Sequence, residues 1–194
     1  MTSVFTEDGR AYAATVINAA ANVVTQIKTK EKDGYGAVQV GAIEKKESRI
    51  NKAQLGHAKG KALKYFREAL GNSEEGIETG QTINVSVFEI GDKVQVSAVS
   101  KGKGFQGVVK RHGFHGGPRS HGQKHSEREP GSIGGSGGRA GGRVAKGIRM
   151  AGRMGGERVT VRNLSVLQVH PETNELLISG AIPGPRGTLV EIRG

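Results

Sequence analysis

The chain has 194 residues, a formal net charge of +11 at pH 7 and no cysteine. Its length suits one domain, or one domain carrying a long excursion. The lack of cysteine excludes disulfides and thiolate chemistry and fits a reducing compartment. No run approaches the roughly 18 apolar residues of a membrane-spanning helix, and residues 1–10 hold no apolar signal core. We therefore expect a soluble, strongly basic protein of the cytosol, with no membrane partner.

The first forty residues predict four short strands separated by turns. Runs rich in Val, Ile and Thr are typical of half-buried strands, and Asp-Gly pairs at 8–9 and 33–34 are strong hairpin signals. The predicted strands are residues 3–6, 12–17, 23–29 and 35–40. This spacing favours an antiparallel barrel or sandwich.

Residues 41–72 break this pattern with Ala, Lys, Gln, Glu and Leu. The apolar residues at 62, 63, 66, 69 and 70 have helical spacing, and Gly71-Asn72 would end the helix. We expect an α-containing insertion packed on the β body. Its lysines at 45, 46, 52, 59, 61 and 64 are either nucleic-acid contacts or a solvated helix face, and the sequence leaves both open.

Strand patterns return on both sides of a long basic segment. The further predicted strands are residues 82–88, 93–100, 158–164, 166–169, 176–179 and 188–192. In the second of these, Val94, Val96 and Ala98 alternate with Gln95, Ser97 and Val99, which indicates one buried face. The composition outside the basic segment is rich in Val, Ile and Ala, so we expect an aliphatic core.

Residues 101–158, called the basic segment below, concentrate the charge. They hold thirteen of the 29 Lys and Arg, three of the 18 Asp and Glu, and 18 of the 32 Gly, a net charge of +10 against +1 elsewhere. A segment with so few large apolar side chains buries too little surface to offset its ordering entropy. We expect residues 112–150 to become ordered only with a partner, and the charge indicates a polyanion.

Nucleic-acid binding is the interpretation that this spacing favours. Lys and Arg recur every three to six residues, as suits successive phosphates, and glycine lets the main chain approach closely. The alternative is a solvated basic tail, but a tail lies at a terminus, whereas predicted strands flank this segment. RNA is favoured over DNA because no major-groove helix or zinc-finger pattern is present.

Three other functions have weaker support in the sequence than nucleic-acid binding: a dinucleotide site, a metal site and catalysis. Residues 102–107 match G-x-G-x-x-G, but the dinucleotide fingerprint needs a helix after the glycines, and residues 108–117 do not predict one. His112, His115, His121 and His125 have spacings unlike a zinc module. No Ser/His/Asp set or paired carboxylate stands out, so we predict no enzyme, no catalytic residue and no cofactor.

Several motifs of the chain together form a recognisable pattern. The first runs through Phe88, Ala98, Ser100, Gly102-Lys103-Gly104, Gly107 and Arg111. Two further blocks are PGSIG at 130–134 and GRVAKGIRMAGRMG at 142–155, and the flanking strands are FTEDG at 5–9 and ERVTV at 157–161. These motifs resemble the bacterial form of the third protein of the large ribosomal subunit, the L-three family, and the resemblance covers essentially the whole chain in order.

The resemblance implies a Greek-key β-barrel of the translation-protein type, formed by residues 1–100 and 158–194 with the insertion at 41–72. It implies that residues 101–157 form a basic loop that enters large-subunit rRNA toward the peptidyl-transferase region. It further implies a role in subunit assembly, binding near the 3′ end of the rRNA, and neighbours of the L-fourteen and L-nineteen type. No small-molecule substrate is implied.

The sequence departs from the family pattern at three places. Family members usually begin with about ten more residues, so Met1-Thr2 resembles the end of their first strand. Gln95 replaces an Asp or Asn of the signature, and Gly135-Ser136-Gly137-Gly138 replaces a glutamine-rich tip that is methylated in some members. That modification is therefore not expected here.

The predicted function is a structural RNA-binding protein of the large ribosomal subunit. Two rivals are a promiscuous RNA or DNA chaperone and a flavin- or nucleotide-binding barrel enzyme. The cations are expected to meet phosphates, with two histidines as secondary contacts. The predicted rRNA-binding residues are Lys101, Lys103, Lys110, Arg111, Arg119, His121, Lys124, His125, Arg128, Arg139, Arg143, Lys146, Arg149, Arg153 and Arg158.

Overall fold

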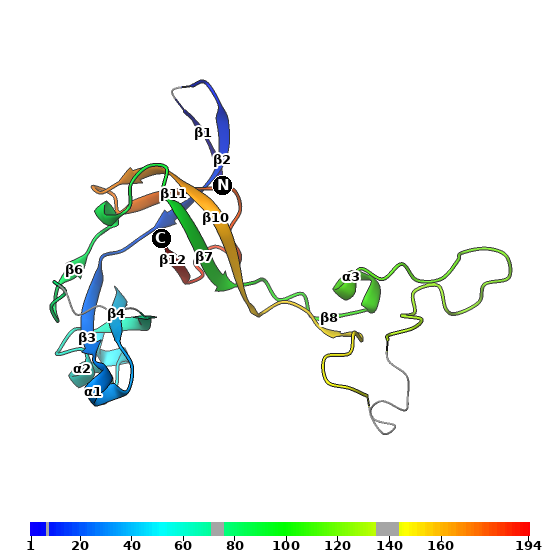
Figure 1. Cartoon of the computed structure of the whole chain (residues 1–194), viewed down its shortest axis with the longest axis horizontal. Helices are drawn as coiled ribbons and strands as arrows, with labels where there is room; N and C mark the ends of the chain where they lie inside the picture. The colour runs from blue at the N-terminus through cyan, green and yellow to red at the C-terminus, as the bar shows by residue number, and fades with distance from the viewer. Residues whose placement is uncertain (7, 71–75, 135–143) are drawn as a thin grey trace. The chain divides into compact units, whose positions relative to one another are not determined.

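The computed structural model describes residues 1–6, 8–70, 76–134 and 144–194. The fold is mainly β, as predicted (Figure 1). Contacts divide the chain into two compact units, which are described separately below. Unit 1 comprises Met1–Gln95, Arg162–Ala181 and Ile192–Gly194, and unit 2 comprises Val96–Val161 and Ile182–Glu191.

Short helices separate some of the strands. The strands are β1 (Thr2–Phe5), β2 (Ala11–Asn18), β3 (Asn22–Lys28), β4 (Ala37–Glu44), β5 (Leu63–Leu70), β6 (Thr82–Ile83), β7 (Lys93–Val99), β8 (Phe105–Gln106), β9 (Gly152–Arg153), β10 (Arg158–His170), β11 (Glu175–Ser179) and β12 (Val190–Arg193). The helices are α1 (Lys30–Asp33), α2 (Lys52–His57) and α3 (Val108–His112), with 3₁₀ turns η1 (Glu47–Arg49) and η2 (Val85–Val87). No helix of the described residues is long and apolar enough to cross a membrane.

The larger sheet has six strands in the order β1-β2-β11-β10-β7-β12. Its strand β11 is buried along most of its length, with Leu176, Leu177 and Ile178 all below a tenth exposed. The strand pairs antiparallel with β2 on one side and β10 on the other, and because consecutive side chains point to opposite faces, its burial shows that both faces of the sheet are covered there. The buried hydrophobic residues that the structure describes are Val, Leu, Ile and Ala, the aliphatic core that the composition predicts.

Two strand predictions near this sheet need correction. The predicted strands 158–164 and 166–169 form one strand, β10, in which Asn163 takes a left-handed φ of 60° and the register shifts between Val166 and Gln168. Only Thr82–Ile83 of the predicted strand 82–88 is β structure, and η2 follows it. The strand pairings among the described residues close neither large sheet on itself, so the predicted barrel is not seen as a closed ring.

The predicted helix over residues 62–70 is wrong. These residues form β5, which pairs antiparallel with β4 from Ala37↔Leu70 to Glu44↔Leu63. Seven residues of β4 have a cross-strand partner on β5. Aromatic residues such as Tyr65 and Phe66 also favour strands. Pairing with β4 therefore outweighs the helical spacing of the apolar residues. The helix of the insertion is α2, earlier in the chain.

The four-stranded sheet of unit 1 has the order β5-β4-β3-β6. A polar cluster bridges two of its strands that are not neighbours. The Lys28 ammonium on β3 lies 2.7 Å from a carboxylate oxygen of Glu68 on β5 and donates to the Tyr35 hydroxyl at 2.6 Å, while that hydroxyl donates to Glu68 at 2.9 Å. Hydrogen bonds from Lys28 and then Tyr35 hold the pKa of Glu68 below its usual range, and Glu68 and Tyr35 raise the pKa of Lys28.

The Lys28–Glu68 pair makes the stability of unit 1 depend on pH. A lowered carboxyl pKa stabilises the fold above the unfolded-state value of about 4.3, and the contribution is lost as the pH falls through the folded value. The raised pKa of Lys28 keeps its contribution complete at neutral pH, below about 10.4. We therefore expect Glu68→Gln to lower the urea midpoint at pH 7 by about 0.1–0.5 M.

The difference between Glu68→Gln and the wild type should be smaller at pH 3 than at pH 7, because the contribution of the carboxylate is lost as the pH falls through its lowered pKa. Glu31→Gln on α1 is the control, because Glu31 is exposed and makes no ion pair within the described residues. Chemical denaturation followed by circular dichroism at both pH values measures the effect. An equal loss at pH 3 and pH 7 would contradict the assignment.

Candidate nucleic-acid interface

The two ends of the basic segment are joined by a backbone ladder within unit 2. Ser100 N–H donates to the Glu157 carbonyl at 2.9 Å, Lys103 N–H to Met154 at 2.9 Å, and Met154 N–H to Gly104 at 2.9 Å. Strands β8 and β9 continue this ladder, with Phe105 opposite Arg153. Figure 1 shows the outgoing and returning chains side by side toward β8. We call residues 100–106 and 152–157 the stem.

Glycine permits the close approach of the two chains in the stem. Gly155 has a φ of 74°, and a Cβ atom there would lie 2.1 Å from the Lys101 carbonyl oxygen. Any side chain at this position therefore collides with the main chain, which would have to shift to accommodate it. Gly116 repeats this arrangement further out, with a φ of 77° and a Cβ position 2.1 Å from the Glu127 oxygen.

A short helix, α3, follows the stem directly, which corrects the expectation that no helix follows Gly107. Gly107 is its N-cap residue and Gly113, with a φ of 73°, ends it. Val108 is buried, and the Arg111 guanidinium donates to the Met150 carbonyl at 2.6 Å. The dinucleotide fingerprint is still not met, because β8 before the helix has two residues and pairs antiparallel with β9.

The predicted contact residues divide by what they touch. Arg139 and Arg143 lie outside the described residues. All the others are exposed except Arg111, which is half-buried against the returning chain. Arg119 pairs with Glu127 at 2.6 Å, and Arg158 makes two hydrogen bonds with Glu191, at 3.0 and 2.6 Å. These two guanidinium groups are already neutralised within unit 2.

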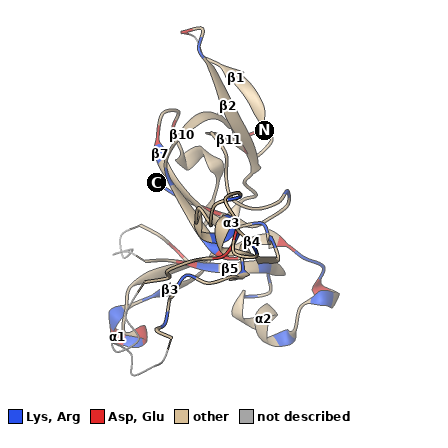
Figure 2. Cartoon of the chain, turned by 90° about the vertical axis from the view of Figure 1, so that its right-hand side faces the viewer, with Lys and Arg blue, Asp and Glu red and all other residues tan. Residues whose placement is uncertain are grey.

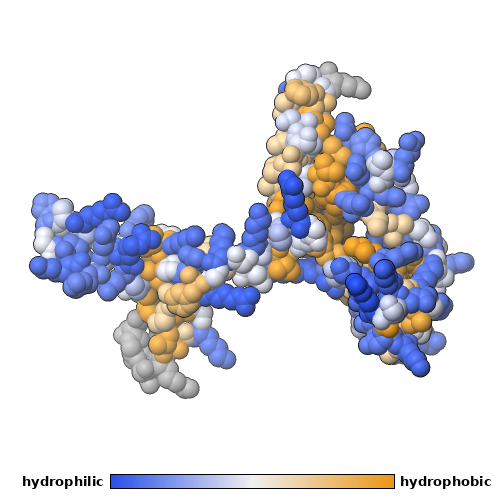
Figure 3. Space-filling model, turned by 180° about the vertical axis from the view of Figure 1, so that it is seen from behind, coloured by the Kyte–Doolittle hydropathy of each residue, from blue (hydrophilic) through white to orange (hydrophobic). Residues whose placement is uncertain are grey.

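The remaining cations are exposed, and none of them has a carboxylate partner among the residues that the structure describes. Within the described part of the chain these residues make no ion pair: Lys101, Lys103, Lys110, Lys124, Arg128, Lys146, Arg149 and Arg153. Figure 3 shows the outer part of the basic segment as largely hydrophilic surface. Such a row of unneutralised charges on a glycine-rich main chain is suited to the phosphates of a polyanion.

The histidines of the basic segment do not form a cluster. His112 bonds to the Met150 carbonyl at 3.0 Å and packs against Phe114, while His121 and His125 are exposed. His121 takes a left-handed φ of 58° in a turn. Among the described residues no three His, Cys, Asp or Glu side chains lie close enough to hold a metal ion.

One basic residue was missed by sequence reasoning. Arg186 is exposed on the loop 182–191, which belongs to unit 2 although it lies far along the chain. Gly184 in this loop approaches β7, since a Cβ atom there would lie 2.9 Å from the Val99 carbonyl oxygen. Local sequence could not have placed this loop next to the end of β7, because only the tertiary fold brings the two segments together.

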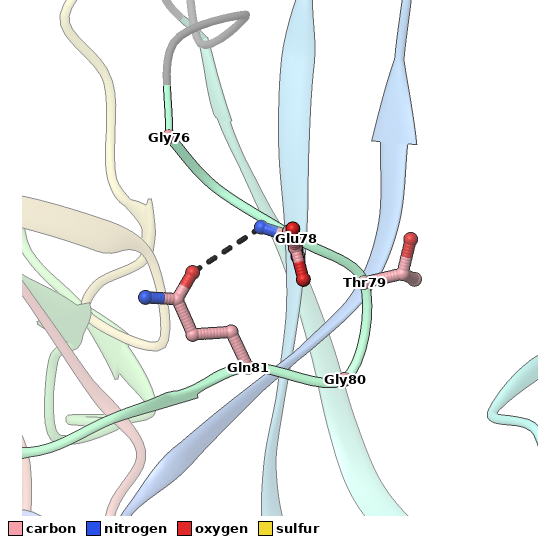
Figure 4. A pocket seen from close by; sticks show the side chains of 5 residues that line it. All are labelled: Gly76, Glu78, Thr79, Gly80 and Gln81. Atoms are coloured by element: carbon pink, nitrogen blue, oxygen red, sulfur yellow. Dashed lines mark hydrogen bonds between the residues drawn. The ribbon is translucent and has the colours of Figure 1, made fainter.

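A hollow in unit 1 offers no alternative site for a nucleotide. Its described lining is Gly76, Glu78, Thr79, Gly80 and Gln81, and the Glu78 N–H donates to the Gln81 side chain at 3.2 Å (Figure 4). The lining side chains include a carboxylate and no cation. A flavin or nucleotide phosphate would meet negative charge there. The hollow therefore does not support the hypothesis of a flavin- or nucleotide-binding barrel enzyme.

Fold and site together define a basic, mainly β protein with a paired stem that carries a row of free cations. Comparison with known proteins identifies its family. Residues 39–176 match the family model described as Ribosomal protein L3, and the chain belongs to this family.

Full-length relatives agree with this assignment. The chain is 50% identical to the large ribosomal subunit protein uL3 of Carboxydothermus hydrogenoformans over 196 aligned residues, covering 100% of this chain and 92% of the relative. It is 47% identical to the protein of the same name from Herpetosiphon aurantiacus (99% and 91% covered) and 46% identical to that from Bacillus cytotoxicus (100% and 92%).

The stem generates a testable expectation. Gly155→Ala should open the ladder, because the new Cβ meets the Lys101 oxygen and a left-handed φ costs an L-residue about 1–2 kcal/mol. Hydrogen exchange of the Lys103 and Met154 amides should become about tenfold faster. Gly102→Ala is the matched control, since Gly102 has no atom within 4 Å of its Cβ position. Equal exchange in both variants would show that the ladder does not depend on this approach.

Proposed function

We propose that the chain is a structural protein of the large ribosomal subunit that binds large-subunit rRNA through its basic segment. The observation that carries the proposal is the row of eight exposed cations without an ion pair among the described residues, in a chain of the L3 family. The protein acts by binding and is not an enzyme. It needs no cofactor, and its place is on the ribosome in the cytoplasm.

Binding follows from electrostatics and from main-chain access. Each free Lys or Arg that meets a phosphate releases a condensed counterion, and Arg can also contact a phosphate with two N–H groups. Glycines let the backbone come close enough to donate its own N–H groups. His121 and His125 are secondary contacts. Arg111, Arg119 and Arg158 should contribute less to binding, because each of them already makes a hydrogen bond or an ion pair within unit 2.

The finer features of the family are part of the same proposal. Residues 1–100 and 158–194 form the body, a Greek-key barrel of the translation-protein type with the insertion at 41–72. Residues 101–157 form the rRNA-binding loop, which runs toward the peptidyl-transferase region and supports subunit assembly. Proteins of the L-fourteen and L-nineteen type are the proposed neighbours. The antiparallel pairing of β1, β2, β11 and β10 in the six-stranded sheet is compatible with such a barrel, and the joined ends of the basic segment support the loop.

Co-sedimentation tests the proposal directly. A tagged copy of the chain, expressed in a bacterium, should remain with large subunits in salt that retains other core proteins. Competition separates the chaperone rival, since a ribosomal protein should prefer large-subunit rRNA over an unrelated RNA of equal length. Loss of the chain from washed subunits, or equal affinity for both RNAs, would overturn the proposal.

Arginines with and without an ion pair should differ in how much they contribute to the salt dependence of RNA binding. Arg149→Gln removes a free cation and should flatten the plot of log binding constant against log salt by about 0.7–0.9. Arg119→Gln removes a cation that Glu127 already neutralises, so its change should be less than half as large. Filter binding to a large-subunit rRNA transcript at several salt concentrations measures both slopes. Equal changes would show that the Arg119–Glu127 pair opens on binding.

The outer part of the basic segment should depend on RNA for its order. Residues 113–134 and 144–150 have few buried side chains and little backbone pairing beyond the bond from Gly117 N–H to the Glu127 carbonyl. In RNA-free protein their amides should exchange within seconds, whereas those of the stem should be protected. Hydrogen exchange with and without the rRNA transcript measures this, and strong protection without RNA would contradict it.

A further inference from the structure

A second concentration of positive charge lies in unit 1. The net charge of +1 outside the basic segment hides it, because residues 45–64 hold seven Lys and Arg and one Glu while the rest is acidic. Residues 45–64, called the insertion loop below, carry a net charge of +6. Its basic residues are Lys45, Lys46, Arg49, Lys52, Lys59, Lys61 and Lys64.

All seven of these side chains are exposed. Figure 2 shows several basic stretches along the chain around α2. Lys64 lies over the Tyr65 ring, 4.8 Å from its centre. Within the described residues none of the seven makes an ion pair. On α1, by contrast, Lys30 and Lys32 alternate with Glu31 and Asp33, so that helix has no net charge.

The insertion loop is closed at its base by the sheet. Glu44 and Leu63 are partners in the β4–β5 pairing, and Lys45 N–H donates to the Ala62 carbonyl at 2.8 Å. Leu63 is only 5% exposed. The two ends of the loop are therefore held together at one place.

The middle of the loop is held by α2. His57 bonds through Nε2 to the Gln39 side-chain oxygen at 2.5 Å and packs edge-on against Phe66. Thr25 donates to the same Gln39 oxygen at 2.9 Å, which holds the amide in one orientation. Ala58, next to His57, is 3% exposed. These contacts present the lysines on an anchored loop, which lowers the entropy that ordering on a ligand costs.

The charge pattern indicates what the loop binds. Like charges without acidic partners repel one another and destabilise the free protein. Lysine is depleted from protein–protein interfaces, whose buried cores are apolar. The apolar residues of this loop, such as Leu55 and Leu63, are half-buried or buried, so its exposed surface offers no apolar anchor. Phosphates of a nucleic acid fit this surface better than an acidic protein does.

We infer that the insertion loop is a second RNA-binding surface, separate in sequence from the basic segment and held by the four-stranded sheet. The identity of the RNA as large-subunit rRNA rests on the proposed function above. Lys52 and Lys61 are the residues chosen to test it, because both are exposed and neither side chain contributes a hydrogen bond to the described structure.

The experiment compares two double variants of the full chain. Lys52→Gln/Lys61→Gln removes two charges from the insertion loop, and Lys30→Gln/Lys32→Gln removes two charges from α1 in the same unit. Filter binding to a large-subunit rRNA transcript is measured over a range of KCl concentrations. The first variant should flatten the salt slope by about 1.4–1.8, as expected for two phosphate contacts, and the second by less than about 0.3.

The outcomes separate the inference from the proposed function. If Lys52→Gln/Lys61→Gln keeps the wild-type slope while Arg149→Gln changes it, the second surface is refuted and the proposed function stands. Equal flattening by both double variants would also refute the inference, because it would reflect net charge alone. If the wild type does not prefer the rRNA transcript to an unrelated RNA of equal length, the proposed function itself fails. Matching circular dichroism spectra confirm that each variant is folded.

Discussion

Unit 2 depends on the joining of two chain segments that have almost no hydrophobic surface to bury. Backbone hydrogen bonds between residues 100–106 and 152–157 bring the ends of the basic segment together. Such bonds need a close approach, and Gly155 provides it because a Cβ atom would meet the Lys101 oxygen. Next to the stem, the Arg158 guanidinium forms a bidentate ion pair with the Glu191 carboxylate. Backbone hydrogen bonds thus hold the stem together, whereas apolar packing holds unit 1 together.

Positive charge serves two purposes in this chain. Some guanidinium groups are used inside the protein, as Arg111 is against the Met150 carbonyl and Arg119 against Glu127. Others, such as Lys103 and Arg149, make no ion pair in the part of the chain that the structure describes. A cation already paired has less to gain from a phosphate, whereas an unpaired one gains the full interaction. These residues cannot be told apart by composition. Only the contacts distinguish a cation that is bonded within the protein from one that makes no ion pair in the described residues.

Unit 1 combines an aliphatic core with polar clusters on its four-stranded sheet. Lys28, Tyr35 and Glu68 connect β3 to β5 across the intervening strand, and Gln39 connects the same carboxylate to Thr25 and His57. Through His57 this network reaches α2 and so the insertion loop. The sheet therefore serves as the support on which the basic loop is displayed, which is the structural basis of the inferred second surface.

The sequence alone determined the class of fold, the family and the place of the basic segment. Alternating residues such as Val94, Val96 and Ala98 set a buried face, and charge and glycine content are properties of composition that no tertiary contact alters. Tertiary structure decided the rest. Residues 63–70 have helical spacing but form β5, because β4 provides cross-strand partners along nearly its whole length. The ion pairs of Arg119 and Arg158 and the assignment of the loop 182–191 to unit 2 likewise depend on residues distant in the chain or across a turn, and local sequence does not predict such contacts.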